Sequence, residues 1–311
     1  MHALRRPSVR SPLPTPGSVS SFALVVGLAL AGMSGGLAGP PNVDPGPPAP
    51  LVRIEVADSS ISIPDILPSG LVRLRLVDHG RRAQRIVLTR LRPRQSATAY
   101  LRGAQRWLAG GDFGLWGVDP GTPGMVAPGD STDVLVQLHP GHYVMARWSN
   151  RTDGSVRIRM ATKVTFEVLA PPTGVPPAAA PEPDLSVRMT DDAYRFSGSL
   201  TPGHHVLRIA NYGFHEHDFE LVRLLDGHTP AEARSWLGGG MQGPAPVKFV
   251  GGLVAVSPGL AGYLDVTLEP GHYLAVCLVP AGADRRPRVD QGMLASIRVP
   301  LAGDVPANGP R

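Results

Sequence analysis

Apolar and polar residues alternate along two matching stretches, one in each half of the chain. The first is LVRLRLVDHGRRAQRIVLTRL (71–91), and the second is HHVLRIANYGFHEHDFELVRL (204–224). In both, an alternating run leads into a turn that contains glycine, and a second apolar run follows. A period of two is typical of strands that bury one face. The pattern therefore predicts a strand–turn–strand unit in each half.

The order of the later elements is repeated as well. Each unit is followed by a short helical stretch with Trp-Leu, a Pro-Gly turn, an alternating strand, a PGHY sequence and a last strand. The helical stretches are AQRWLAGG (104–111) and ARSWLGGG (233–240), and the last strands are KVTFEV (163–168) and LASIRV (294–299). A repeated order of elements indicates a duplication rather than shared composition.

Each half offers about seven short strands separated by turns, which is typical of a Greek-key β-sandwich. The 37 glycines and 34 prolines also suit turns better than long helices. We therefore predict an all-β fold of two tandem Greek-key domains, each with one short helix. Their predicted bounds are 51–170 and 185–300, with a Pro/Ala linker at 171–184 and a tail at 301–311.

The repeated PGHY sequence has a structural interpretation. A Pro-Gly turn followed by tyrosine suits a tyrosine corner, in which the phenol bonds back to a backbone group near the turn. Tyr143 and Tyr273 are the predicted corner residues. His142 and His272 are then expected to be turn residues that face water.

The amino terminus predicts export. Arg5, Arg6 and Arg10 precede an apolar run, Phe22 to Met33, which is short for a bilayer span, and small residues follow it. We expect a signal peptide at 1–38 and a Pro-rich leader at 39–50, and hence a periplasmic or extracellular protein. An uncleaved membrane anchor is the alternative.

The charge distribution and the cysteine content limit the classes of binding partner and the roles open to the thiol. The net charge is +5, and the arginines are scattered without a compact basic run, which argues against nucleic acid. Cys277 is the one cysteine, so no internal disulfide can form. In an exported protein such a thiol is either a buried small apolar group or a reactive or metal-binding one.

The second half resembles the cupredoxins, the blue-copper family of the plastocyanin type. The segment from Asn211 to Phe219 is similar to the family's Asn-turn-His segment and puts His217 at the ligand position. Cys277 and the Gly-Met pair ending at Met293 are similar to its last ligand loop. The resemblance implies copper as cofactor, held by imidazole, thiolate and thioether groups, and electron transfer with an unknown redox or envelope partner.

This loop departs from the family pattern at one position. Arg288 stands where a second ligand histidine is expected, and no histidine lies between Cys277 and Met293. Arginine stays protonated and offers no lone pair to a cation. His215 is two residues from His217, on the same face of a strand, and is the candidate substitute ligand. The alternative is that Cys277 and Met293 only fill the core.

The first half keeps no set of soft ligands. Gln84 stands in the place of His217, Arg147 in the place of Cys277, and Thr162 near the place of Met293. We therefore expect this half to be a copper-free scaffold or a partner-binding module.

Two functions of different classes remain. Copper nitrite reductases and multicopper oxidases resemble the layout in outline, but the histidine clusters that they need are missing here, so we expect no enzyme. The first function is copper binding or electron transfer through an incomplete type 1 site. The second is a metal-free envelope module that recognises a protein or an anionic ligand through its loops, with Arg285, Arg286 and Arg288 as candidate contacts.

Overall fold

The computed structural model describes residues 47–110, 117–150, 156–283 and 285–301, and the side chains among them except those of 149–163. The predicted signal peptide, most of the Pro-rich leader and the tail after Leu301 lie outside the described residues. Contacts within the chain separate Met1–Asp44 from Pro45–Arg311, and all of the described helices and strands belong to the second unit. Among the described residues, no helix is long and apolar enough to cross a membrane.

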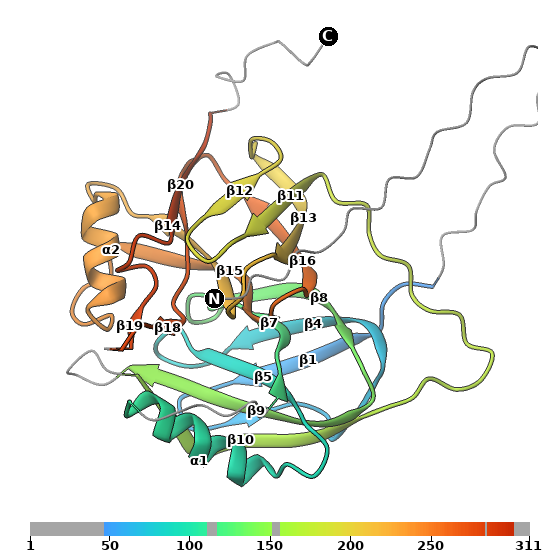
Figure 1. The fold of residues 1–311 in the computed structure, drawn as a ribbon. Coiled ribbons are helices and arrows are strands. Elements are labelled where there is room, and N and C mark those ends of the chain that lie inside the picture. Colours follow the sequence, from blue (N-terminus) through green and yellow to red (C-terminus); the bar gives the residue numbers. More distant parts are fainter. Residues whose placement is uncertain (1–46, 111–116, 151–155, 284, 302–311) are drawn as a thin grey trace, which may run out of the picture. The chain divides into compact units, whose positions relative to one another are not determined.

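Short strands make up most of the first half (Figure 1). Its elements are β1 (Leu51–Val56), β2 (Ile61–Ser62), β3 (Ile66–Pro68), β4 (Gly70–Asp78), β5 (Arg85–Leu91), α1 (Ala97–Leu108), β6 (Gly117–Val118), β7 (Pro120–Pro123), β8 (Ser131–Leu138), β9 (Gly141–Asn150) and β10 (Val156–Leu169).

The second half has a similar order of strands around one helix, after a segment, 170–184, without helix or strand. Its elements are β11 (Leu185–Met189), β12 (Tyr194–Phe196), β13 (Gly203–Asn211), β14 (His217–Leu224), α2 (Pro230–Gly238), β15 (Val247–Val256), β16 (Ala261–Leu268), β17 (Gly271–Val276), β18 (Pro280–Ala281), β19 (Arg286–Pro287) and β20 (Leu294–Val299).

The two strands of each predicted strand–turn–strand unit belong to different sheets. β4 pairs with β1 and β8, whereas β5 pairs with β9 and β6. In the second half, β13 pairs with β11 and β16, and β14 pairs with β15 and β17. The turn between the strands therefore crosses from one layer of a sandwich to the other, and apolar residues fill the space between them. The prediction of an all-β fold of sandwich layers with short helices is confirmed.

Hydrogen-bonded sheets run through both halves. β8 pairs with β16, which joins strands of the two halves in one sheet of order β12-β11-β13-β16-β8-β4-β1-β2. β7 of the first half also adds to the edge of the second half's sheet, where Pro123 lies opposite Leu253. The halves therefore share backbone hydrogen bonds and core residues as well as the connecting segment.

Both PGHY sequences form the predicted tyrosine corners. The phenol of Tyr143 donates to the carbonyl oxygen of His139 at 2.8 Å, and that of Tyr273 donates to Glu269 at 2.9 Å. His142 is exposed as expected, while His272 is half-buried and lies 2.6 Å from the Ser296 hydroxyl. The repeated motif thus fixes the turn that leads into β9 and β17.

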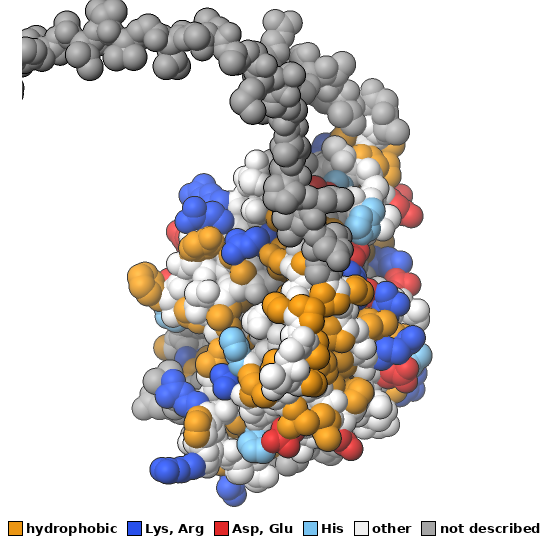
Figure 2. Space-filling view, turned by 90° about the vertical axis from the view of Figure 1, so that its right-hand side faces the viewer, with side chains coloured by type: hydrophobic (Ala, Val, Ile, Leu, Met, Phe, Trp, Pro, Cys, Tyr) orange, Lys and Arg blue, Asp and Glu red, His pale blue; other side chains and the backbone are white. Residues whose placement is uncertain are grey.

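The predicted helical stretches lie at the ends of α1 and α2. α1 begins earlier than the Trp-Leu pattern indicates, because the Ser96 side chain caps its first turn. α2 begins with a capping box between Thr229 and Glu232. On the face seen in Figure 2, Lys and Arg side chains are scattered among apolar and uncharged ones, as the sequence indicates.

Candidate metal centre

Three adjacent strands bring the predicted ligands to one end of a sheet. β14 pairs with β17, and β17 pairs with β20. His217 is the first residue of β14, Cys277 follows β17, and Met293 precedes β20. All three side chains are buried, and the Nδ1 atom of His217 lies 3.8 Å from the Sγ atom of Cys277. Cys277 and Met293 belong to the same apolar core cluster.

A carboxylate fixes the orientation of the buried imidazole. The Nε2 atom of His217 lies 3.0 Å from Oδ1 of Asp191. Burial lowers the pKa of His217, and the charge of Arg288 also opposes protonation, although the bond to Asp191 favours it. The ring is therefore neutral, with its proton on Nε2 facing the carboxylate. Nδ1 then carries the lone pair, and it faces the thiol.

Several hydrogen-bond donors surround the side chain of Asp191. Desolvation raises its pKa, but bonds from the rings of His215 and His217 and from the N–H groups of Phe214 and His215 outweigh this effect and hold the pKa well below its ordinary value. Asp191 is therefore an ionised carboxylate that accepts hydrogen bonds from these groups. Nothing in the sequence marks Asp191 as the partner of these rings, because they lie more than twenty positions further along the chain.

His215 does not come between His217 and the sulfur. Its Nδ1 atom lies 3.0 Å from the same Asp191 oxygen, and its side chain is 64% exposed. Since the two nitrogens of the His217 ring point in diverging directions, Asp191 and Cys277 lie on different sides of that ring. His215 is thus held on the Asp191 side.

Burial keeps the cysteine as a thiol. It raises the pKa of Cys277 to about 12, and the nearby charge of Asp218 acts in the same direction. The backbone N–H of Asp218 points at Sγ from 3.4 Å. Such a bond favours a thiolate once a cation replaces the proton.

Backbone hydrogen bonds connect the described residues of the loop from Cys277 to Met293. Its middle folds into the β18–β19 pair. The N–H of Val289 donates to the Cys277 carbonyl at 2.8 Å, and the N–H of Cys277 donates to the Met293 carbonyl at 3.3 Å. Both sulfur residues are therefore placed by the loop backbone.

Arg288 occupies the side of the site near Asp191. Its guanidinium donates to the backbone oxygen of Asp191 at 2.9 Å, and its buried Nε atom has no hydrogen-bond partner among the described residues. Arg285 donates to the carbonyl oxygens of Trp107 and Gly282 and packs over the Trp107 ring. Both arginines thus donate hydrogen bonds to backbone carbonyl oxygens of the same chain.

The equivalent place in the first half contains an arginine. Arg147 is buried, and its guanidinium donates to the carbonyl oxygens of Ala57, Asp58 and Ser60. Gln84 precedes β5 and donates to the Arg82 carbonyl. Thr162 lies in β10, and its side chain is outside the described part of the chain.

Acidic side chains at alternate positions of β14 face the first half, and sequence reasoning missed them. Asp218 is fully buried and accepts from Arg85 at 2.5 and 3.2 Å and from the N–H of Leu278 at 3.0 Å. Glu220 accepts from the N–H of Met125 at 2.8 Å. The sequence feature that could have identified them is the alternation of acidic residues in the segment EHDFE (216–220).

A carboxyl pair adds to this junction. Asp119 and Glu216 are hydrogen-bonded through their side chains. Burial raises the pKa of Glu216 well above its ordinary value, and the Asp119 charge raises it further. Glu216 therefore keeps its proton and donates a hydrogen bond to Asp119. The contact between the halves thus contains both an ion pair, Arg85 with Asp218, and a carboxyl pair that shares a proton-donating hydrogen bond.

The donor types at this end of the sheet suit a soft cation. An imidazole lone pair, a thioether and the thiolate that Cys277 would become on releasing its proton to solvent are groups that suit Cu(I). Arg288 removes the fourth ligand of a type 1 site. Among the described residues, no group of three or more His, Cys, Asp and Glu side chains is arranged to hold a metal, so a three-ligand site with His217 and Cys277 would need the Met293 thioether.

Comparison with known proteins gives structural matches only. No family model and no curated protein matches the chain. It is similar to auracyanin from Roseiflexus castenholzii (13% identity, 37% of this chain and 95% of the other, TM-score 0.28) and to auracyanin B (20% identity, 40% and 94%, TM-score 0.27). A multicopper oxidase matches over 82% of this chain and 93% of its own length (13% identity, TM-score 0.23).

The description of the fold rests on the strand pairing and on the two tyrosine corners of this chain. The all-β sandwich layers are consistent with the fold that the cupredoxin resemblance implies. The second half contains the candidate ligands His217, Cys277 and Met293, and the first half has Arg147 in the place of the cysteine.

Proposed function

We propose that this cupredoxin-like protein is exported and binds one copper ion, as Cu(I), through His217, Cys277 and Met293. The observation that carries the proposal is the 3.8 Å contact between Nδ1 of His217 and Sγ of Cys277, whose side chains are both fully buried. Asp191 directs the Nδ1 lone pair of His217 toward the sulfur, which is the role that carboxylates take behind metal-bound histidines.

The missing histidine decides which oxidation state is favoured. Thiolate and thioether groups suit Cu(I), whereas Cu(II) prefers a larger share of nitrogen ligands. Copper bound here would supply a soft, redox-active centre to an unidentified partner in the cell envelope. We infer a copper carrier or a one-electron donor rather than an enzyme.

The test is anaerobic titration of the full chain with Cu(I) in competition with a colorimetric chelator. We expect one equivalent per chain and loss of tight binding in Cys277→Ser and His217→Ala. Met145→Leu is the matched control, because Met145 is a buried methionine of the first half. Equal binding by wild type and Cys277→Ser would overturn the proposal.

A further inference from the structure

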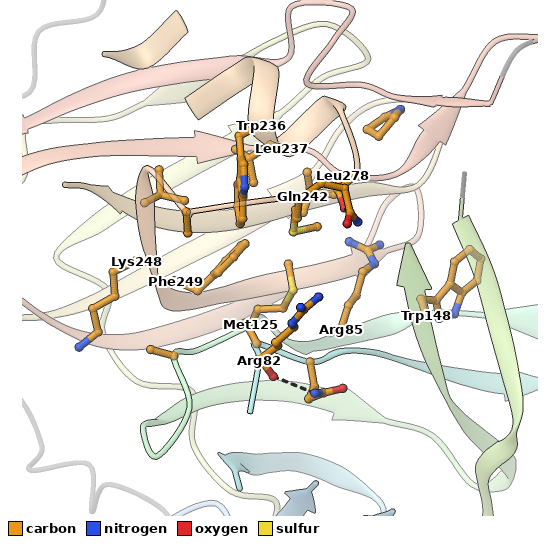
Figure 3. A pocket seen from close by; sticks show the side chains of 18 of the residues that line it. Arg82, Arg85, Met125, Trp148, Trp236, Leu237, Gln242, Lys248, Phe249 and Leu278 are labelled. Atoms are coloured by element: carbon orange, nitrogen blue, oxygen red, sulfur yellow. Dashed lines mark hydrogen bonds between the residues drawn. The ribbon is translucent and has the colours of Figure 1, made fainter. Parts of the chain in front are cut away.

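A cavity of about 670 Å³ lies between the two halves, apart from the candidate metal ligands. One wall comes from the segment that leads into β5, and the other from α2, β15 and the loop between them (Figure 3). Left-handed conformations at Gly240, Met241 and Gly243 turn this loop around the cavity. The volume is that of a site for a small organic molecule.

Apolar side chains form most of the lining. Trp236 and Phe249 pack against each other with ring centroids 6.4 Å apart, and Met125 faces them from the first half. Leu278, the residue after Cys277, lies on the same lining. This surface matches the body of an aromatic or aliphatic molecule.

The charged residues of the lining all have one sign. Arg81, Arg82, Arg85 and Lys248 contribute to it, and no Asp or Glu is found among the described residues that line it. Arg81 pairs with Asp58, Arg85 with Asp218 and Lys248 with Asp130.

Arg82 differs from the other three cations. Its side chain is exposed, and no partner of its guanidinium is found within the described part of the chain. In Figure 3, Arg82 and Arg85 extend from the first half toward the space below Gln242 and Leu278. A cation without a partner, beside an apolar cavity, favours an anionic group at that position.

We propose that this cavity binds a small amphipathic anion, with its apolar body between Met125, Trp236 and Phe249 and its negative group at Arg82. The proposal does not depend on copper. A bound anion would also approach Arg85, whose guanidinium bonds Asp218, and Asp218 in turn bonds the backbone of the Cys277 loop.

Fluorescence titration of the full chain with 8-anilino-1-naphthalenesulfonate tests the site, with its neutral parent N-phenyl-1-naphthylamine beside it. We expect saturable binding of the sulfonate at one site, and weaker binding of the neutral dye. Dodecanoate should displace the sulfonate better than dodecanol does. Near-UV circular dichroism establishes that each variant is folded.

Two variants and one control separate the elements of the proposal. Arg82→Gln should weaken sulfonate binding about tenfold, the effect of losing one charge-assisted hydrogen bond. Ala245→Trp places a large ring at an exposed position of the lining and should abolish binding of both dyes. Arg195→Gln, an exposed arginine of β12, should change nothing. Equal affinity for the two dyes, or unchanged binding in Arg82→Gln or Ala245→Trp, would overturn the proposal.

Discussion

Arg85 and Asp218 form a two-point ion pair across the junction of the halves, at 2.5 and 3.2 Å. The side chains are 10% and 0% exposed. Asp218 also accepts from the N–H groups of Ala255 and Leu278. One carboxylate therefore connects the first half, β15 and the loop that follows Cys277.

Removing one partner of this pair should destabilise the protein strongly. In Asp218→Asn the Arg85 charge stays buried without its counterion, and we expect a loss of about 3 kcal/mol in the free energy of unfolding, measured by urea denaturation. The double variant Arg85→Met/Asp218→Asn should recover part of this loss. If the double variant is less stable than Asp218→Asn, the unpaired charge of Arg85 is not the cause of the lost stability.

Stability should fall as the pH rises above about 5. Burial raises the pKa of Glu220 well above its ordinary value. The unfolded chain then loses this proton at about pH 4.3, while the native state keeps it, so the stabilisation is complete below that pH and decreases at up to ~1.4 kcal/mol per unit above it. Thermal unfolding of Glu220→Gln between pH 5 and 8 should show a shallower decline. Glu182→Gln, in the exposed connecting segment, should keep the wild-type slope.

Asp191→Asn should weaken Cu(I) binding without removing a ligand. The carboxylate holds the proton of His217 on Nε2, and an amide directs this tautomer less strongly. We expect affinity to fall roughly tenfold to a hundredfold. Asp192→Asn is the matched control, since Asp192 bonds only Thr190 among the described side chains. An unchanged affinity in Asp191→Asn would show that the tautomer does not matter.

Arg288→His should restore the ligand that the family resemblance implies. With a second imidazole beside the thiolate, the site gains the nitrogen donor that Cu(II) favours. We expect intense visible absorption on adding Cu(II), absent from wild type and lost again in Arg288→His/Cys277→Ser. A colourless Arg288→His variant that still binds Cu(I) would mean that the loop cannot place the new ring.

The sequence alone determined the local elements and the donor types. Strands, helices and tyrosine corners follow from short-range patterns, because alternation, turns and caps depend on neighbouring residues. The choice of His217, Cys277 and Met293 as candidate ligands came from the resemblance to the cupredoxins. Arg288 and Arg147 could likewise be recognised from the sequence as residues that cannot bind a cation.

Only the tertiary structure decided how the halves join. The β8–β16 pairing, the Arg85–Asp218 ion pair and the cavity beside Arg82 unite residues that are more than a hundred positions apart. Strand partners are chosen by burial on both faces of a sheet, which no single stretch of sequence specifies. For the same reason, only the tertiary structure identifies Asp191 as the hydrogen-bond partner of His217.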